Sequence, residues 1–345
     1  MRTIIAIDAM GGDVAPKAPI DGVVHALHRY PDIKFLIFGD QSTIRPLLEQ
    51  HLVDSSRYEI RHCDEIITSD MKPSAALRSS KNSSMRLAIE AVRDGEAHGV
   101  VSAGNTGAYM ALAKVILKMV EGIDRPAIAG VMPTAAGNSI MLDMGANVEC
   151  SAQALVQFAM MGEVFAKAIL HKKKPSIGLL NVGAETLKGN DVVKEAYTLL
   201  KEGDQLSNFY GFVEGDDILM GTTDVVVTDG FSGNIALKTA EGAVKLMGIF
   251  FKREMKKSLL ARMGAFLAQK ALRNLQAHID PRKHNGAILL GLTGIVVKSH
   301  GGTDGFGFSS AITVAYELII NKAVSQIQNG LEKLNKHSET SQEPT

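Results

Sequence analysis

The sequence predicts an α/β fold with a largely parallel sheet covered by helices on both faces. Short apolar, β-branched runs alternate with longer segments of helical periodicity along almost the whole chain. This alternation is typical of βαβ units, whose buried parallel strands read as continuous apolar runs. Several runs also end in glycine-rich polar turns, and ligands bind at the carboxyl ends of strands in open parallel sheets.

The expected elements follow one another without a clear linker. The runs that favour strands are 4–7, 35–38, 100–102, 128–132, 140–142, 177–181, 225–228 and 295–298. The segments whose apolar spacing favours helices are 18–29, 84–93, 106–119, 152–169, 192–201, 234–252 and 311–334. We therefore expect residues 1–334 to form a single two-lobed unit. The polar tail 335–345 is expected to be disordered.

Composition excludes several classes of protein. Apolar residues make up 46% of the chain and charged residues 21%, as in an ordinary globular protein. Lys plus Arg and Asp plus Glu number 37 each, so the chain lacks the basic excess that drives nucleic-acid binding. Cys63, Cys150 and the histidines match no metal-binding spacing, so no metal site is expected. The absence of a signal pattern and of a long apolar run predicts a cytosolic protein.

Five glycine-rich turns are the candidate binding elements, at 8–13, 102–108, 142–147, 181–185 and 228–234. Glycine lets the backbone approach a phosphate closely, and a following helix presents free N–H groups. Placed at the ends of parallel strands, the five turns are expected to converge on one crevice. None of them is a dinucleotide fingerprint or a P-loop.

Several side chains near these turns could act on an anion or a carbonyl. Lys188 could hold a phosphate or polarise a carbonyl, although a solvated pair with Glu185 is the alternative. Asn234 supplies a hydrogen-bond donor, and His300 could bring a titratable one, although a lone histidine is more often structural. The turns contain no nucleophile elbow. If phosphate is the nucleophile, the protein need only position the reactants and stabilise an oxyanion.

Read in order, the segments IDAMGGDVAP, SAGNTGA, LDMGAN, NVGAE, KGN and TDGFSGN resemble the PlsX family of acyl-acyl carrier protein:phosphate acyltransferases. The resemblance runs from Ile4 to about Leu334. It implies a Rossmann-like three-layer α/β/α fold, similar to phosphotransacetylases and to isocitrate/isopropylmalate dehydrogenases. It also implies a homodimer that moves a long-chain acyl group from an acyl carrier protein thioester to inorganic phosphate. The acyl phosphate would serve a downstream glycerol-3-phosphate acyltransferase in phospholipid synthesis, without metal or cofactor.

Catalytic roles are expected for Lys188, Asn234, Glu185 and His300, with Lys188 and Asn234 orienting phosphate and stabilising the oxyanion. Family members often carry two glutamates where this chain has Ala184 and Glu185. The expected substrate- and phosphate-binding residues are Asp8, Gly11, Gly12, Asp13, Ser102, Gly104, Asn105, Thr106, Gly107, Asp143, Asn147, Asn181, Asp229, Ser232 and Gly233.

A basic, apolar insertion spans about 252–283, with nine Lys and Arg against two acids. One long helix and two short helices meeting at a tip both fit its periodicity. Such a surface suits an anionic membrane, a fatty acyl chain or an acidic carrier protein, and the alternative is a helix pair that packs a dimer. The residues expected to contact membrane or carrier are Leu259, Leu260, Met263, Phe266 and Leu267.

Three other functions compete with this interpretation. A short-chain phosphate acyltransferase that uses coenzyme A thioesters would share the fold. A decarboxylating dehydrogenase is less favoured, because the sequence has neither an acidic metal cluster nor a cofactor fingerprint. A non-catalytic membrane scaffold for lipid synthesis would need only the basic insertion.

Overall fold

The computed structural model describes residues 2–203 and 208–340. The first lobe is built from strands and helices that alternate up to residue 117. Its elements are β1 (Thr3–Asp8), α1 (Lys17–Arg29), β2 (Ile33–Gly39), α2 (Gln41–Gln50), η1 (Ser55–Arg57), β3 (Tyr58–His62), α3 (Pro73–Ser79), α4 (Ser84–Arg93), β4 (Gly99–Ser102) and α5 (Thr106–Leu117).

The second lobe begins with a β-hairpin and returns to the alternating pattern. Its elements are β5 (Ala127–Thr134), β6 (Gly137–Leu142), α6 (Ala152–Ile169), β7 (Ile177–Leu180), α7 (Asp191–Glu202), β8 (Phe209–Val213), α8 (Asp217–Met220) and β9 (Val225–Val227). The rest of the chain comprises α9 (Gly230–Lys256), α10 (Leu259–Leu267), α11 (Gln269–His278), η2 (Pro281–His284), β10 (Ala287–Leu290), β11 (Ile295–Lys298), α12 (Gly305–Ile320) and α13 (Ala323–Thr340).

All the strands join one 11-stranded sheet in the order β3-β2-β1-β4-β11-β10-β5-β6-β9-β7-β8. β11 pairs with β4 and thereby belongs to the first lobe. The strands of the first lobe are parallel to one another. β10 is antiparallel to both β11 and β5, and β6 is antiparallel to β5. The second-lobe strands β6, β9, β7 and β8 therefore run opposite to those of the first lobe.

Helices cover both faces of the sheet, because alternate residues of a strand point to opposite sides. On β1, Ile5 and Ile7 pack in one core cluster with Ile20 of α1. Ala6, between them, packs in a second cluster with Met85 of α4. This is a three-layer α/β/α arrangement with a mostly parallel sheet, and the predicted fold class is confirmed.

Among residues 2–203 and 208–340, the structure contains all eight expected strands and three more. β3 and β8 lie at the two ends of the sheet, and β10 follows the helical insertion. The expected helix 311–334 is divided into α12 and α13, because Lys322 has a left-handed backbone with φ of 52°. α13 runs from Ala323 to Thr340, beyond the expected helix end at 334, and the disorder of the tail stays a prediction. The expected tail 341–345 lies outside the described residues.

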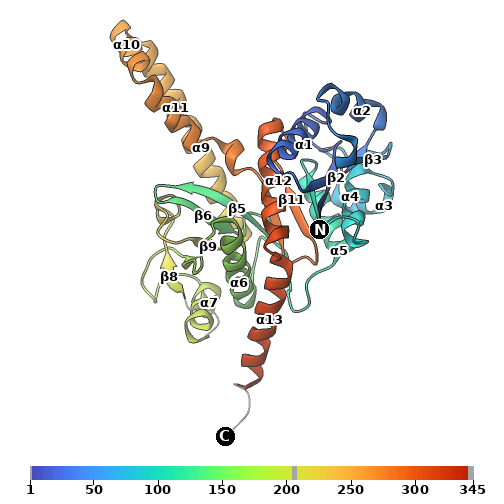
Figure 1. The fold of residues 1–345 in the computed structure, drawn as a ribbon. Coiled ribbons are helices and arrows are strands. Elements are labelled where there is room, and N and C mark those ends of the chain that lie inside the picture. Colours follow the sequence, from blue (N-terminus) through green and yellow to red (C-terminus); the bar gives the residue numbers. More distant parts are fainter. Residues whose placement is uncertain (1, 204–207, 341–345) are drawn as a thin grey trace.

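The basic insertion forms an arm that projects from the body (Figure 1). We define the arm as residues 241–280: the distal part of α9, then α10 and α11. The chain reverses after Lys257, and α10 packs back along α9. The arm thus combines the two expected forms, one long helix followed by two short ones. In the parts of the chain that the structure describes, no helix has both the length and the apolar character that a bilayer crossing needs.

Candidate active site

Asp8, Ser102 and Lys298 form one row across three neighbouring parallel strands. Asp8 is paired with Ser102 in the register of β1 and β4, and Ser102 is paired with Lys298 in the register of β4 and β11. Each is the last residue of its strand. Paired residues of parallel strands point to the same face of a sheet. The three polar side chains therefore share one face at one edge, which we call the first edge.

Asp8 is the buried acid of this row, with 1% of its surface exposed. Its carboxylate accepts hydrogen bonds from the hydroxyls of Ser84 (2.7 Å) and Ser102 (2.6 Å). Burial raises the pKa of Asp8, and the two serine hydrogen bonds oppose that rise. A side chain at Gly11 would collide with the Asp8 carboxylate and with the Gly104 amide. The predicted turns 8–13 and 102–108 are therefore packed against each other.

Lys298 is the cation of the row, and sequence analysis did not single it out. Its Nζ donates to the carbonyl oxygens of Ala103 (3.2 Å) and Ser299. Partial burial lowers the pKa of Lys298 to about 8, against the charges of Asp8 and Asp13, which raise it. One feature of the sequence could have pointed to Lys298: it ends an apolar run directly before a glycine-rich turn.

His300 lies in the turn that follows Lys298, at the same edge. Its amide donates to the side-chain oxygen of Asn285 (2.9 Å), and its Nδ1 accepts from the Gly302 amide (3.2 Å). The imidazole is exposed. The amide of Asp13 donates to the Gly301 carbonyl (2.9 Å), so the turn after β1 is also attached to this segment. The turn that carries His300 is thus joined to the turn that carries Asp13, at the edge where Asp8 ends β1.

The turn after β4 leads directly into α5. Asn105 caps this helix, since its side-chain oxygen accepts from the Ala108 amide (3.1 Å). Its side-chain nitrogen donates to three carbonyls in the segment 68–71. Asn105 is therefore occupied in holding a loop. Thr106 and Gly107 follow it as the first residues of the helix, where main-chain N–H groups are free to bind an anion.

Asp143 organises a separate group of predicted residues. It is fully buried and accepts from the amides of Ile128 (3.0 Å), Gly145 (3.0 Å), Ala146 (2.9 Å) and Asn147 (2.8 Å). The side chain of Asn147 also donates to it (2.8 Å). All these partners belong to the protein, so Asp143 and Asn147 hold the turn after β6 in shape.

The start of α9 packs on this same turn. Asp229 caps the helix by accepting from the amide (2.8 Å) and hydroxyl (2.9 Å) of Ser232. A side chain at Gly233 would collide with the Asp143 carbonyl. Asn234 is exposed, and its side chain donates to the Met144 carbonyl (3.2 Å). The predicted residues 143–147 and 229–234 are therefore one local group.

Lys188 and Glu185 form an exposed ion pair, with 2.9 Å between Nζ and Oε2. The hydrogen bond between Lys188 and Glu185 lowers the pKa of Glu185 and raises the pKa of Lys188. Asn181 supports this loop by donating to the Gly183 (3.1 Å) and Lys188 (3.0 Å) carbonyls. The charges that act on Lys188 are Glu185 and Glu214, whereas those that act on Lys298 are Asp8 and Asp13. The two lysines have separate surroundings.

The five turns do not converge on one edge of the sheet, and that expectation is wrong. The turns after β1, β4 and β11 lie at the first edge. Because strand direction reverses between β11 and β6, the turns after β6, β7 and β9 lie at the opposite edge. Lys188, Asn181 and the group around Asp143 therefore belong to that second edge.

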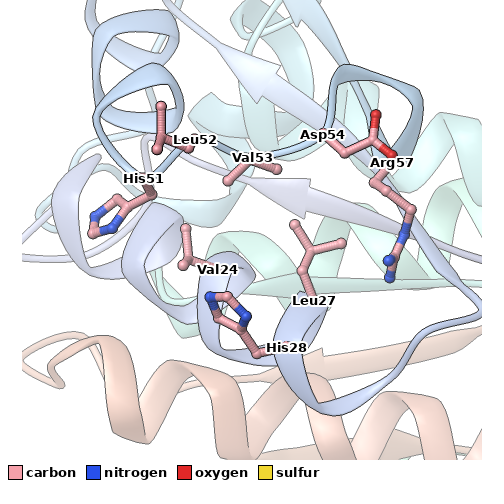
Figure 2. A pocket seen from close by; sticks show the side chains of 8 residues that line it. All are labelled: Val24, Leu27, His28, His51, Leu52, Val53, Asp54 and Arg57. Atoms are coloured by element: carbon pink, nitrogen blue, oxygen red, sulfur yellow. The ribbon is translucent and has the colours of Figure 1, made fainter.

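A small hollow lies away from both groups of turns, between α1 and the segment after α2 (Figure 2). Its volume is about 150 Å³. It contains no expected site residue, and its lining is Val24, Leu27, His28, His51, Leu52, Val53, Asp54 and Arg57. Among the residues that the structure describes, no cluster of three or more His, Cys, Asp or Glu side chains could hold a metal ion.

Similarity to solved structures agrees with the fold. A phosphotransacetylase from Streptococcus pyogenes superposes with a TM-score of 0.63 at 18% identity, covering 92% of this chain and 94% of that one. A branched-chain phosphotransacylase from Enterococcus faecalis gives a TM-score of 0.58 at 14% identity, covering 92% and 99%. At such identities the likeness concerns the fold alone.

Several phosphate acyltransferases are much more similar to this chain in sequence than these solved structures are. A phosphate acyltransferase of Paramagnetospirillum magneticum is 54% identical over 330 residues, which are 96% of this chain and 94% of that protein. A phosphate acyltransferase of Rhodospirillum rubrum is 52% identical over 316 residues, covering 92% and 90%. The model of a family described as "Fatty acid synthesis protein" matches residues 3–326. The chain is an acyltransferase and belongs to this family of fatty acid synthesis proteins, the PlsX family.

Proposed function

We propose that this acyltransferase moves a long-chain fatty acyl group from an acyl carrier protein thioester to inorganic phosphate. The product is an acyl phosphate, which a glycerol-3-phosphate acyltransferase would consume in phospholipid synthesis. The names of the relatives support phosphate as the acceptor. The family description supports a fatty acyl substrate.

The observation that carries this proposal is that the segment directly after the arm, 281–285, is attached to the first edge. The Asn285 side chain donates to the Ser299 hydroxyl (2.8 Å) and accepts from the His300 amide (2.9 Å). Arg282 donates to the Asp304 carboxylate (2.8 Å). A surface that suits lipid is thus joined directly to an edge that suits an oxyanion.

The chemistry requires little from the protein beyond placement. A phosphate oxygen attacks the thioester carbonyl, a tetrahedral oxyanion forms, and the carbon–sulfur bond breaks. At the first edge, the N-terminus of α5 offers main-chain N–H groups, and Lys298 offers a positive charge. Fixed donors of this kind stabilise developing negative charge without reorganisation. The row of Asp8, Ser102 and Lys298 is therefore the proposed phosphate site.

The arm supports the choice of a lipid substrate. The side chains of Leu259, Leu260, Phe266 and Leu267 are between 74% and 82% exposed, and Met263 is 62% exposed. Exposed apolar groups beside an excess of basic residues suit an anionic bilayer and an acidic carrier protein. We propose that the arm places the enzyme peripherally on the inner face of the cell membrane. A homodimer, as the resemblance implies, forms part of the same proposal.

Lys188 defines the alternative place for phosphate, at the second edge. There the ligand would have to displace Glu185 from an existing ion pair. Because the pair is exposed, its loss should change the stability of the fold little. The Lys188→Ala variant is expected to fold normally and to lose less turnover than a Lys298 variant. A loss of about 10²–10³ in turnover, the scale of a missing oxyanion donor, would restore the role that the resemblance implies for Lys188.

The decisive experiment is incubation with long-chain acyl carrier protein and phosphate, followed by detection of acyl phosphate and released carrier. Parallel reactions contain the matching acyl coenzyme A or a short-chain donor. Preference for the long-chain carrier thioester supports the proposal. Preference for short acyl coenzyme A would favour the phosphotransacetylase-like alternative, and release of carrier without acyl phosphate would contradict phosphate as acceptor. Complete inactivity with every donor would favour the scaffold.

A further inference from the structure

Lys298 holds a position that the expected site residues leave unexplained. It is the only cation in the row with Asp8 and Ser102, and its side chain extends over the start of the 102–108 turn to the Ala103 carbonyl. We propose that the Lys298 ammonium binds the phosphate dianion at the first edge and then protonates the departing thiolate. This inference rests on the proposed function and deepens it.

The hydrogen-bond geometry leaves Lys298 able to take a ligand. An ammonium group has three N–H donors. Two of them meet main-chain carbonyls, those of Ala103 and Ser299. Among the described residues, no carboxylate lies within 4.0 Å of the Lys298 Nζ, whereas Lys188 is already paired with Glu185. The third donor of Lys298 can therefore reach an anion without breaking an ion pair.

Asp8 stays near Lys298 without pairing to it. The Asp8 carboxylate is occupied by the hydroxyls of Ser84 and Ser102. Its proximity favours the protonated form of Lys298 but leaves the ammonium free. This arrangement keeps a cation at a partly buried position before phosphate arrives.

The proton balance of the reaction closes at this lysine. Monohydrogen phosphate attacks the acyl carbon through one oxygen, and the carbon–sulfur bond gives its electron pair to sulfur. The thiolate takes a proton from the Lys298 ammonium and leaves as a thiol. The acyl phosphate then gives its remaining proton to the Lys298 amine and leaves as a dianion. A pKa of about 8 is close to that of a thiol, about 8.5, which suits general-acid catalysis near neutral pH.

Two substitutions separate the two roles. Lys298→Met keeps length without charge, and its kcat/KM for phosphate is expected to fall by about 10²–10³. Lys298→Arg keeps the charge but does not lose its proton in the working pH range. Its KM for phosphate should stay within about threefold of wild type, while kcat falls. The wild type is expected to lose activity above pH 8, where Lys298 gives up its proton, and the Lys298→Arg variant is expected not to show this loss. Lys114→Met, an exposed lysine on α5, is the matched control. A Lys298→Met enzyme with wild-type KM, kcat and alkaline profile overturns the inference.

A measurement without acyl donor keeps this inference separate from the proposed function. A small amine-acetylating reagent at pH 8 is applied with and without inorganic phosphate, and mass spectrometry follows each lysine. Phosphate is expected to slow the acetylation of Lys298 several-fold and to leave Lys188 unchanged. Protection in an enzyme that does not use acyl carrier protein would defeat only the proposed function. Protection of Lys188 instead, or of neither lysine, would defeat the phosphate role of Lys298.

Discussion

The side-chain nitrogen of Asn285 lies 2.8 Å from the hydroxyl of Ser299, which is fully buried. Asn285 comes directly after η2, where the chain returns from the arm, and Ser299 comes directly after the Lys298 that ends β11. The arm and the first edge are therefore connected by side-chain contacts as well as by the chain itself. The same amide donates to the Gly307 carbonyl (2.7 Å) in the first turn of α12.

Replacement of Asn285 tests this connection. Asn285→Ala removes two donated bonds and one accepted bond, and it leaves the Ser299 hydroxyl buried without that partner. We expect a loss of about 2 kcal/mol in unfolding free energy and a fall in turnover, because the turn that carries His300 loses its support. Denaturant unfolding and steady-state kinetics measure the two effects. Asn321→Ala, which removes a hydrogen bond to Glu317 at the far end of α12, is the control and should alter stability alone.

The buried carboxyl group of Asp8 predicts a pH dependence with a defined sign. Burial raises its pKa in the folded state above the ordinary value of 3.8. As pH rises from 3.8 to the higher pKa of the folded state, Asp8 loses its proton in the unfolded chain first, so the wild type loses stability. Asp8→Asn lacks this effect, and its stability relative to wild type should increase as pH rises above about 3.8.

Asp40 provides a control of opposite sign for the Asp8 measurement. Hydrogen bonds from the Ser42 hydroxyl and amide lower the pKa of Asp40. The stability that the Asp40 carboxylate contributes is fully present above pH 3.8 and is lost as pH falls through the lowered pKa of the folded state. Asp40→Asn should therefore lose stability relative to wild type as pH rises. Equal pH profiles of the two variants, from thermal melts between pH 3 and 7, would contradict both assignments.

Asp143 is expected to matter for folding more than for chemistry. Asp143→Ala would leave four main-chain amides and the Asn147 side chain without their acceptor at a buried position. Because Asp143 itself is fully buried, leaving several partly buried donors unsatisfied around it should cost more than about 3 kcal/mol. Thermal melts and the yield of folded protein give the measurement. A variant that melts like wild type but has lost turnover would show instead that Asp143 acts on the substrate.

The tip of the arm predicts membrane binding that depends on apolar contact. In the Leu259→Glu/Leu260→Glu variant, two of the three exposed leucines of α10 become acidic, so binding to anionic vesicles should fall at least tenfold. Co-sedimentation with vesicles of phosphatidylglycerol and phosphatidylethanolamine measures it. Leu52→Glu, at a leucine that is 92% exposed outside the arm, is the control and should bind like wild type. A double variant that pellets fully with the vesicles would remove the membrane part of the proposal.

Local patterns predicted much of the fold, because buried parallel strands leave strong apolar runs. Ile4–Ile7 and Val225–Val227 are of this kind. β3, with the sequence YEIRH, was missed because an edge strand is covered on fewer sides and keeps charged residues. The division of the helix at Lys322 was also missed, because a single lysine in a left-handed conformation leaves no pattern.

The candidate site was predicted only in part, because its arrangement depends on strand pairing between segments far apart in the sequence. Asp8, Ser102 and Asp13 were expected together and lie together. The reversal of direction between β5 and β6 separates Lys188 and Asn181 from them. Strand direction is decided by pairing between distant segments, which glycine-rich turns do not encode. Lys298 was missed for the same reason, since its place beside Ser102 depends on the register of β4 and β11.

The arm is fixed to both lobes, and this gives it leverage on the junction between them. Just before the arm, Ala236, Leu237 and Ala240 of α9 pack on the core cluster of the second lobe that contains Met141 and Val226. Just after the arm, Asn285 is bonded to the 299–307 segment of the first lobe. If the arm binds a bilayer as proposed, a bilayer that tilts its tip applies torque to both lobes at once, and the stiffness of α9 determines how much of that torque reaches the sheet.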